Sequence, residues 1–349
     1  MHALFRGLVL LSVATPLALA LDSADDFFHG LPRHSQNHRR TKIVLGSYPI
    51  WKKTDDYRKD DFFNDFTFEA IPDPTHGRVN YVDKQTAIAH GLATCTPDSF
   101  VMRADSTTVL DPAGPGRESI RLQSKKQWTS GVFVLDLKHM PVGCGYWMTQ
   151  HIGWPQNGEI DVLEGYCSQI PNRSAIHTVN GCSMSTPQSS MTGNIVSTNC
   201  SYLNNYNEGC AVLWENRQDS YAKPLNDMGG GWFVTERTDD HVSIWFWGRN
   251  DENVPPAVRS GSRIICTKEF GKPIAYWESS NTCNLAKVLG PHNIIINLTL
   301  CGDWAGQPDV YRASGCPGTC IDNVNNNPGC FKDAYWEINS LRVYSQLYK

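Results

Sequence analysis

The sequence predicts an all-β fold, a sandwich of two β-sheets. Short segments rich in β-branched and aromatic residues recur along the chain, and Gly, Pro, Asn and Asp fill the gaps between them. No long helical periodicity competes with this pattern, which is typical of a sandwich or a barrel. A chain of this length does not close a small barrel simply, so the sandwich is favoured. The expected strands lie at 98–104, 118–124, 131–140, 242–249, 293–300 and 335–344.

The strand expected at 242–249 carries aromatic side chains on both faces. In an alternating strand, Trp245 and Trp247 share one face, while Ile244 and Phe246 share the other. Such a strand is either covered on both sides or has one face lining a groove. Because aromatic stripes usually pack in cores, we favour the first interpretation.

The first twenty residues have the features of a secretory signal peptide: a basic residue, an apolar run and small residues at the end. The run is short and interrupted by Pro16, which disfavours a signal anchor, and no later segment is suited to span a membrane. Residues 21–42 are polar and aperiodic, as in a flexible leader or pro-segment. Within them, Arg39–Arg40 is either a dibasic processing site or an ordinary solvated pair. Residues 43–349 show no repeat and no change of composition, so we expect a single domain there.

The twelve cysteines agree with secretion into an oxidising environment. Their number is even and none lies in the signal segment, so disulfides are expected, with their pairing left open. Cys316 and Cys320 lack the C-x-x-C spacing of a metal or redox motif, which favours structural disulfides there. Three N-x-S/T sequences, at Asn172, Asn199 and Asn297, are candidate glycosylation sites. The net charge of −4 argues against a nucleic-acid partner.

The segment NGEIDVLEGY, residues 157–166, combines strand-forming residues with three carboxylates. Its apolar residues favour a buried strand, whereas Glu159, Asp161 and Glu164 repel one another and are costly to desolvate. In a regular strand Glu159 and Asp161 share a face, and Glu164 falls on the other. A β-bulge between Asp161 and Glu164 adds one residue and brings all three to one face. We therefore predict a bulge in this strand.

With the bulge, the spacing of the two outer glutamates fits a glycosidase. Their Cα atoms lie about 13 Å apart, and inward leaning leaves roughly 5–6 Å between the carboxyl groups, as in retaining and not inverting enzymes. One outer Glu must be ionised to attack the anomeric carbon, and the other protonated to protonate the leaving oxygen. The middle Asp can hydrogen-bond one of them. The alternatives are a calcium loop, which prefers turn-forming spacers, and a solvated acidic edge, which needs no apolar residues.

The segment EIDVLE resembles the catalytic signature of glycoside hydrolase family sixteen, in its bulged, laminarinase-like form. The likeness extends over nearly all of the chain from about residue 45, and it is to secreted fungal endo-1,3(4)-β-glucanases. The resemblance implies a jelly-roll, concanavalin-like sandwich whose concave face forms an open carbohydrate cleft. It also implies the roles that the spacing leaves open: Glu159 as nucleophile, Asp161 as its assistant and Glu164 as acid/base. The matching stretches are 69–87, 118–133, 139–145, 229–238 and 293–306.

Further positions match cleft residues of this family. His177 resembles its histidine near the reacting bond, although a lone strand histidine is otherwise more often structural. Trp304 resembles its sugar-stacking tryptophan, whose ring face complements the apolar face of a pyranose. Arg121 and Asn80 match cleft positions on neighbouring strands, where the alternatives are an ordinary strand arginine and a turn-edge asparagine.

The chain departs from the family between Gly145 and Glu159. Relatives usually carry a W-P-A-x-W run there before W-P-N-G, whereas only WPQNG at 154–158 is clear in this chain, and segment 146–153 is a few residues short. Trp154 remains a candidate substrate-binding residue. Either Trp147 stands in for a missing tryptophan, or a sugar subsite is weakened, or the sequence is wrongly assembled there.

These observations predict a secreted, retaining endo-β-glucanase that cuts β-1,3 bonds in β-1,3-linked, 1,6-branched or mixed 1,3/1,4 glucans. The chemistry needs neither cofactor nor metal; the family allows a structural calcium ion, but no loop in this sequence requires one. We expect a monomer whose partner is the β-glucan itself, with no membrane partner. Two rival functions are a transglycosylase, in which a sugar replaces water as acceptor, and a non-catalytic glucan-binding lectin, which the loss of one outer glutamate would have favoured.

Overall fold

The computed structural model describes residues 49–144, 146–147, 154–165 and 171–347. Residues 1–20 and 21–42, the expected signal peptide and leader, lie outside these ranges. Residues Tyr48–Lys349 form one compact unit. Among the described residues, no helix is both long enough and apolar enough to cross a membrane.

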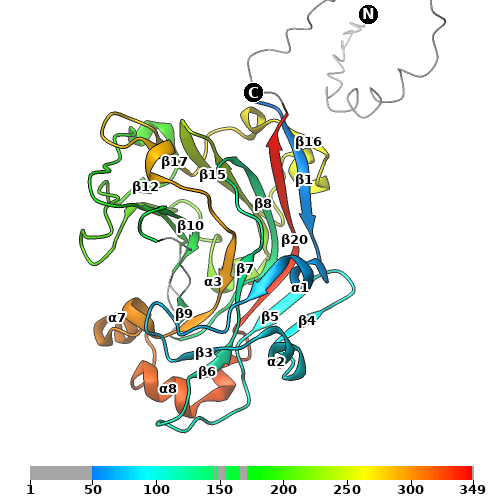
Figure 1. Ribbon diagram of the computed structural model, residues 1–349, viewed down its shortest axis with the longest axis vertical. Coiled ribbons are helices and arrows are strands. Elements are labelled where there is room, and N and C mark those ends of the chain that lie inside the picture. The colour runs from blue at the N-terminus through cyan, green and yellow to red at the C-terminus, as the bar shows by residue number, and fades with distance from the viewer. Residues whose placement is uncertain (1–48, 145, 148–153, 166–170, 348–349) are drawn as a thin grey trace, which may run out of the picture. The chain divides into compact units, whose positions relative to one another are not determined.

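The larger layer of the fold is a nine-stranded antiparallel sheet built around the C-terminal strand, β20 (Figure 1). Its strands follow the order β16-β1-β20-β8-β14-β15-β17, with β5 also paired to β20 and β4 paired to β5. The bounds are β1 Trp51–Tyr57, β4 Ala93–Cys95, β5 Phe100–Arg103, β8 Gly131–His139, β14 Gly231–Arg237, β15 His241–Gly248, β16 Ile264–Ile265, β17 Ala275–Glu278 and β20 Tyr335–Gln346.

The second layer consists of smaller sheets. One has the order β10-β11-β13-β12, a second has the order β18-β7-β2, and β19 pairs with β9. Beside them, β3 and β6 form a parallel pair. The bounds are β2 Phe66–Phe68, β3 Val79–Tyr81, β6 Arg117–Ser119, β7 Arg121–Ser124, β9 Tyr146–Trp147, β10 Glu159–Glu164, β11 Arg173–His177, β12 Asn194–Ile195, β13 Cys210–Leu213, β18 Ile295–Asn297 and β19 Thr299–Leu300.

All helices in the described part of the chain are short connections between strands. The α-helices are α1 Asp61–Asp65, α2 Lys84–Ala89, α3 Ala222–Asp227, α4 Pro256–Ser260, α5 Leu285–Val288, α6 Gly302–Ala305, α7 Pro308–Ala313 and α8 Cys320–Asn326, and the 3₁₀ turns are η2 Gln188–Ser190, η3 Thr267–Phe270 and η4 Pro328–Phe331. The all-β sandwich predicted from the sequence is therefore confirmed. Each expected strand is present, although 118–124 and 293–300 are each divided into two short strands.

The main hydrophobic core contains residues of both layers. Phe233 and Phe246 of the large sheet belong to the same cluster as Leu122 and Ile176 of the smaller sheets. A second cluster on the other face of the large sheet contains Trp245 and Trp247, together with residues of α4 and η3. Both faces of β15 are therefore covered, as the alternating aromatic residues predicted.

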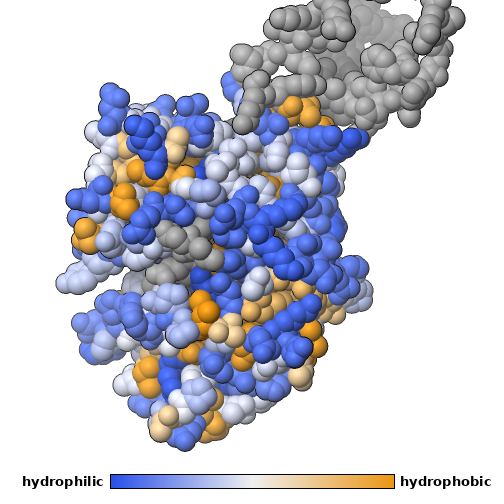
Figure 2. Space-filling model, viewed as in Figure 1, coloured by the Kyte–Doolittle hydropathy of each residue, from blue (hydrophilic) through white to orange (hydrophobic). Residues whose placement is uncertain are grey.

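The described surface shows hydrophobic side chains mixed with hydrophilic ones (Figure 2). The large hydrophobic residues that are exposed are scattered along the chain, and single exposures of this kind are normal in folded proteins. They are Ile71, Ile88, Val109, Val196, Leu203, Tyr206 and Ile321.

Four disulfides lie in the described chain, and they join residues 10 to 172 positions apart. They are Cys144–Cys316, Cys182–Cys283, Cys200–Cys210 and Cys301–Cys320. Cys316 and Cys320 belong to two different disulfides, which confirms a structural role for them. By closing loops in the unfolded chain, such bonds reduce its conformational entropy.

Shortening Phe246 to alanine is expected to destabilise the sandwich by about 3–5 kcal/mol, because it opens a cavity in the core. The Phe246 ring is 6% exposed and its centroid lies 4.7 Å from that of Phe233. Denaturant unfolding measures the loss. The control is Val109→Ala, at a residue that is 64% exposed, where a change within about 0.5 kcal/mol is expected. A loss below about 1 kcal/mol for Phe246→Ala would contradict the description of the core.

Candidate active site

Strand β10 contains the predicted β-bulge. Its register with β11 is regular as far as Asp161, which lies opposite Ala175, but Glu164 then lies opposite Arg173. Two residues of β10 thus stand against a single residue of β11 between these pairs, which is the count that defines a bulge. The bulge between Asp161 and Glu164 is therefore confirmed.

The three carboxylates of β10 are almost completely buried. Glu159, Asp161 and Glu164 expose 4%, 7% and 5% of their surface. The apolar residues between them pack against the core cluster. Buried carboxylates are costly unless charges or hydrogen bonds compensate them, so the neighbours of β10 determine what this strand can do.

The turn before β10 depends on a glycine. Gly158 has φ +66°, and a Cβ at this position would lie 2.6 Å from the Val288 carbonyl oxygen. The preceding Asn157 carbonyl accepts hydrogen bonds from the Gly290 amide and from His292 Nε2. A residue with a side chain at 158 would therefore displace the start of β10.

Burial raises the pKa of Glu159 well above its usual range, and the negative charges of Asp161 and Glu164 raise it further. The positive charges of His177 and Arg121 act in the opposite direction. Its Oε1 atom is buried without a hydrogen-bond partner among the described residues. The free site therefore favours retention of a proton by Glu159.

His177 supplies a positive charge to this set. It is 3% exposed and lies opposite Glu159 in the β10–β11 register. Its Nε2 lies 3.1 Å from Asp161 Oδ2, as a close ion pair. Although burial opposes a charge on the imidazole, the hydrogen bond and charge of Asp161, with the charges of both glutamates, raise the pKa of His177 to about 9. The imidazolium thus offsets part of the buried negative charge.

The other ring nitrogen of His177 is held by the loop between β12 and β13. Its Nδ1 lies 2.9 Å from Asn207 Oδ1. Asn207 is the last of three consecutive residues with positive φ, an uncommon conformation outside glycine that often accompanies functional sites. Gly209 follows, where a Cβ would lie 2.8 Å from the His177 ring. The loop is therefore shaped to fit the histidine.

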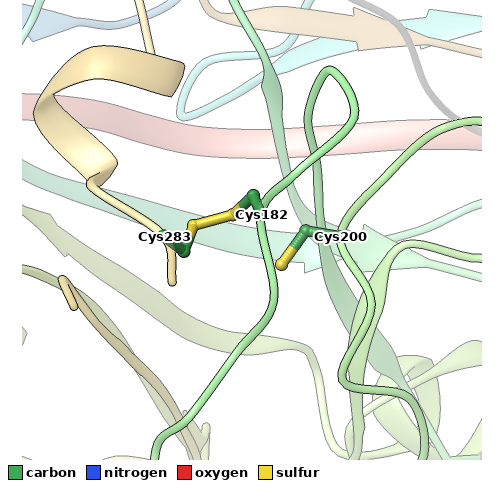
Figure 3. A group of neighbouring side chains, drawn as sticks. All are labelled: Cys182, Cys200 and Cys283. Carbon is green, nitrogen blue, oxygen red and sulfur yellow. A yellow bond between two sulfur atoms is a disulfide. The ribbon is translucent and has the colours of Figure 1, made fainter. Parts of the chain in front are cut away.

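The same loop is closed by the Cys200–Cys210 disulfide, and a second disulfide lies beside it. Figure 3 shows the Cys182–Cys283 bond next to the side chain of Cys200. The sulfur atoms of these three cysteines lie within 4.8 Å of one another. Because all three are in disulfides, they hold the loop in place and have no thiolate to offer a metal.

Arg121 enters the site from β7. It is 3% exposed, and its Nε donates to Glu69 Oε2 at 2.9 Å. On the neighbouring strand Asn297 lies opposite it, and the Asn297 amide contacts the Tyr81 hydroxyl at 3.4 Å. The predicted Asn80 is half-buried next to Tyr81 on β3. The structure thus brings Arg121 into electrostatic contact with Glu159, whereas a role of Asn80 in the cleft stays a prediction.

Trp304 lies near the other end of β10. It belongs to α6, and the guanidinium of Arg173 stands over its ring, 5.7 Å from the centroid. Arg173 lies opposite Glu164, so Trp304 is beside the Glu164 end of the strand. Arg173 also donates to the Glu208 carbonyl, while its Nε is buried without a hydrogen-bond partner among the described residues.

Of the two candidate tryptophans before β10, Trp154 has a described side chain and Trp147 has a described backbone only. Trp154 is half-buried, packs edge-on against Tyr202 at 5.1 Å, and has a buried Nε1 without a partner in the described part of the chain. The backbone of Trp147 pairs with Thr299 in the β9–β19 ladder. Its side chain, and the rest of the shortened segment, lie outside the described residues.

A group of buried ligand atoms also exists at the site. Atoms of Glu159, Asp161 and His177 lie within 4.8 Å of one another, close enough to hold a cation. The Asp161–His177 ion pair already uses one carboxylate and the imidazole. We therefore interpret the group as a charge-balanced set of acids and base.

Comparison with known proteins agrees with this geometry. The family model described as "XgeA-like, catalytic GH16 domain" matches residues 66–344. The chain belongs to the GH16 family. This membership makes it a glycoside hydrolase, with the β-sandwich of that family.

Individual GH16 proteins resemble the chain over most of its length. It is 44% identical to laminarinase 16A from Phanerochaete chrysosporium, whose structure was solved with β-glucans in donor and acceptor sites, with a TM-score of 0.82 over 85% of this chain and 100% of that one. A structure of an elongating β-1,3-glucosyltransferase is 35% identical, with a TM-score of 0.77 over 84% and 100%. A probable endo-1,3(4)-β-glucanase of Aspergillus clavatus is 36% identical over 96% of this chain and 50% of its own. The chain thus spans about half the length of that relative.

The structure buries two of the three candidate glycosylation sites in this GH16 chain. Asn172 is 0% exposed and both atoms of its amide are hydrogen-bonded to the backbone of β10. Asn297 is 3% exposed and its amide nitrogen contacts Tyr81. Neither amide nitrogen has room for a glycan in the folded chain. Asn199 is exposed and remains the candidate.

Sequence reasoning missed several residues that shape the site. Glu69, Arg173 and Asn207 each contact a predicted site residue, but none forms a recognisable motif with it. The structural role of Asn172 could have been predicted from the bulge. A predicted bulge leaves backbone groups off the ladder, and a polar residue on the paired strand is the natural partner for them.

Replacing Glu159 by glutamine is expected to stabilise the folded protein near neutral pH while abolishing activity. Because the folded-state pKa of Glu159 is raised, its ionisation destabilises the fold as pH climbs above the unfolded-state value, and the penalty levels off once the folded-state pKa is passed. The gain should be largest near neutral pH and should shrink in acid. Melting curves of both proteins across pH measure it. A less stable Glu159→Gln protein at neutral pH would contradict the account.

Proposed function

We propose that the chain is a secreted, retaining endo-β-glucanase. It cleaves β-1,3 bonds in β-1,3-linked, 1,6-branched or mixed 1,3/1,4 glucans through a covalent glycosyl-enzyme intermediate. The observation that carries this proposal is the bulged strand β10, with three buried carboxylates and the His177 imidazolium beside them. GH16 membership supports it, as do the laminarinase and glucanase names of its relatives.

In the first step, a carboxylate oxygen of Glu159 attacks the anomeric carbon while the bond to the leaving oxygen breaks. Glu164 gives its proton to that oxygen. In the second step, Glu164 takes a proton from water, the water oxygen bonds to the anomeric carbon, and Glu159 is released. The attack requires an ionised Glu159, and the positive charges of His177 and Arg121 favour that form against the burial and the neighbouring carboxylates that raise its pKa.

Side chains near β10 offer contacts to the sugar. Trp304 presents a ring for stacking beside the Glu164 end, and Trp154 is a second aromatic candidate before β10. Arg121 lies within electrostatic reach of Glu159, and Asn80 is a further candidate contact to the sugar. The proposed chemistry uses no cofactor or metal ion, so activity should survive dialysis against a chelator.

Secretion and domain organisation form part of the proposal. The disulfides support an oxidising compartment, and they fit a signal peptide at 1–20 and a leader at 21–42. A single catalytic domain over 43–349 would act as a monomer, which the scattered exposed hydrophobic residues support.

A transglycosylase is the second candidate function. The similarity to an elongating glucosyltransferase favours it, because the same glycosyl-enzyme can be released by a sugar in place of water. Product sizing over time, with and without an added acceptor oligosaccharide, distinguishes the two. Products longer than the substrate at millimolar acceptor would favour transfer.

Digestion of laminarin is expected to release the β anomer first, because two displacements at the anomeric carbon retain its configuration. NMR of the newly formed reducing end, recorded before mutarotation, measures this. Parallel digestion of a mixed-linkage glucan defines the linkage range. An initial α anomer would contradict the assignment of Glu159 as nucleophile, and an absence of products from both glucans would contradict the proposed substrate class.

The Glu164→Ala protein is expected to lose roughly 10²–10⁴-fold in activity on glucans, the usual contribution of a general acid. Substrates with good leaving groups should be much less affected, because they need no proton. Added azide should restore turnover and give a β-glycosyl azide, since Glu159 is still present. An α-linked azide, or none, would show that the roles of Glu159 and Glu164 are wrongly assigned.

A further inference from the structure

The bulge in β10 creates a local problem for the backbone. Where two residues of one strand stand against one of its neighbour, backbone groups leave the regular ladder. In a buried strand, a group left without a hydrogen bond costs stability and allows the strand to slip. A slip of one residue would turn Glu164 away from the face of Glu159.

Two side chains around the start of the neighbouring strand β11 bind the backbone of the bulge. Asn172 Oδ1 accepts a hydrogen bond from the Glu164 amide at 3.1 Å, and Asn172 Nδ2 donates to the Val162 carbonyl at 2.8 Å. Ser174 Oγ donates to the same carbonyl at 2.8 Å. The bulge is thus bound at both of its ends.

The backbone of Asn172 is itself fixed. Its N–H donates to Ser220 Oγ at 3.1 Å, and its carbonyl accepts from the Trp214 amide at 3.0 Å. Asn172 and Ser174 are both 0% exposed. A side chain with this many buried partners has little freedom to move, so it can hold the backbone of Glu164 in one position.

We propose that Asn172 and Ser174 are positioning residues that hold the bulge of β10 and thereby place Glu164 for proton transfer. The inference rests on the proposed roles of Glu159 and Glu164. It also reinterprets the Asn172-Arg-Ser174 sequence, in which the asparagine and the serine of an apparent glycosylation signal both bind the catalytic strand.

The test compares two substrates of Asn172→Ala: laminarin, whose leaving sugar needs a proton, and a dinitrophenyl β-glycoside of a β-1,3-glucan oligosaccharide, whose leaving group needs none. Misplacement of the acid should reduce the rate on laminarin about 10²-fold and the rate on the dinitrophenyl substrate less than tenfold. In a Glu164→Ala background, Asn172→Ala should have little further effect on either substrate.

Asn226→Ala is the matched control. Like Asn172, Asn226 uses both atoms of its amide to bind backbone groups. It accepts from the Met140 amide and donates to the Met140 carbonyl, each at 2.9 Å, just after the end of β8. Its loss should lower stability without changing the ratio of the two rates. Ser174→Ala, which removes one of the two bonds to Val162, should shift the ratio in the same direction as Asn172→Ala and by less.

Equal losses on the two substrates for both Asn172→Ala and Ser174→Ala would overturn the inference. If Asn172→Ala does not fold, Ser174→Ala is judged by the same ratio. A glycan on Asn172 in the active secreted enzyme, detected by peptide mass spectrometry, would also overturn it. If Glu164→Ala itself loses equally on both substrates, the proposed roles fail first, and this inference fails with them.

Discussion

The one-residue bulge in β10 is the constraint on which the site depends. Without it, alternation along the strand would send Glu164 to the face opposite Glu159 and Asp161. With it, the apolar residues of the strand pack into the core, and the three acids lie within electrostatic reach of one another. The bulge therefore places the two outer carboxylates on one face of the strand, an arrangement suited to double displacement.

Burying three carboxylates close together costs free energy, and positive charges on the neighbouring strands offset part of that cost. His177 contributes a positive charge from β11, and Arg121 contributes a second from β7. The His177 ring is fixed on its other side by Asn207, in a loop that a disulfide closes. The acids, the histidine and the arginine are thus held on strands of one layer, and the loop that orients the histidine is covalently closed. Such rigidity suits a site whose geometry must hold within fractions of an ångström.

Structural features that follow from the spacing of side chains along a strand could be predicted from the sequence. Contacts between distant segments could not. The alternation in β15 predicted its two covered faces, and the spacing of Glu159, Asp161 and Glu164 predicted the bulge. The pairing of the cysteines and the contact of Asn207 with His177 depend on how loops meet in space, which no local pattern encodes. The three-residue signal at Asn172 says nothing of burial, whereas the fold places that residue against the backbone of β10.

The most direct test of this account is to trap the glycosyl-enzyme. A 2-deoxy-2-fluoro glycosyl donor with a good leaving group slows the second displacement more than the first, so the intermediate accumulates. Peptide mass spectrometry of the inactivated protein should find one sugar on Glu159, both in the natural chain and in the Glu164→Ala variant, because that variant keeps the nucleophile. A label on Glu164, or an enzyme that turns over glucan but is never labelled, would contradict the claim that the bulge places a nucleophile and an acid on the same face.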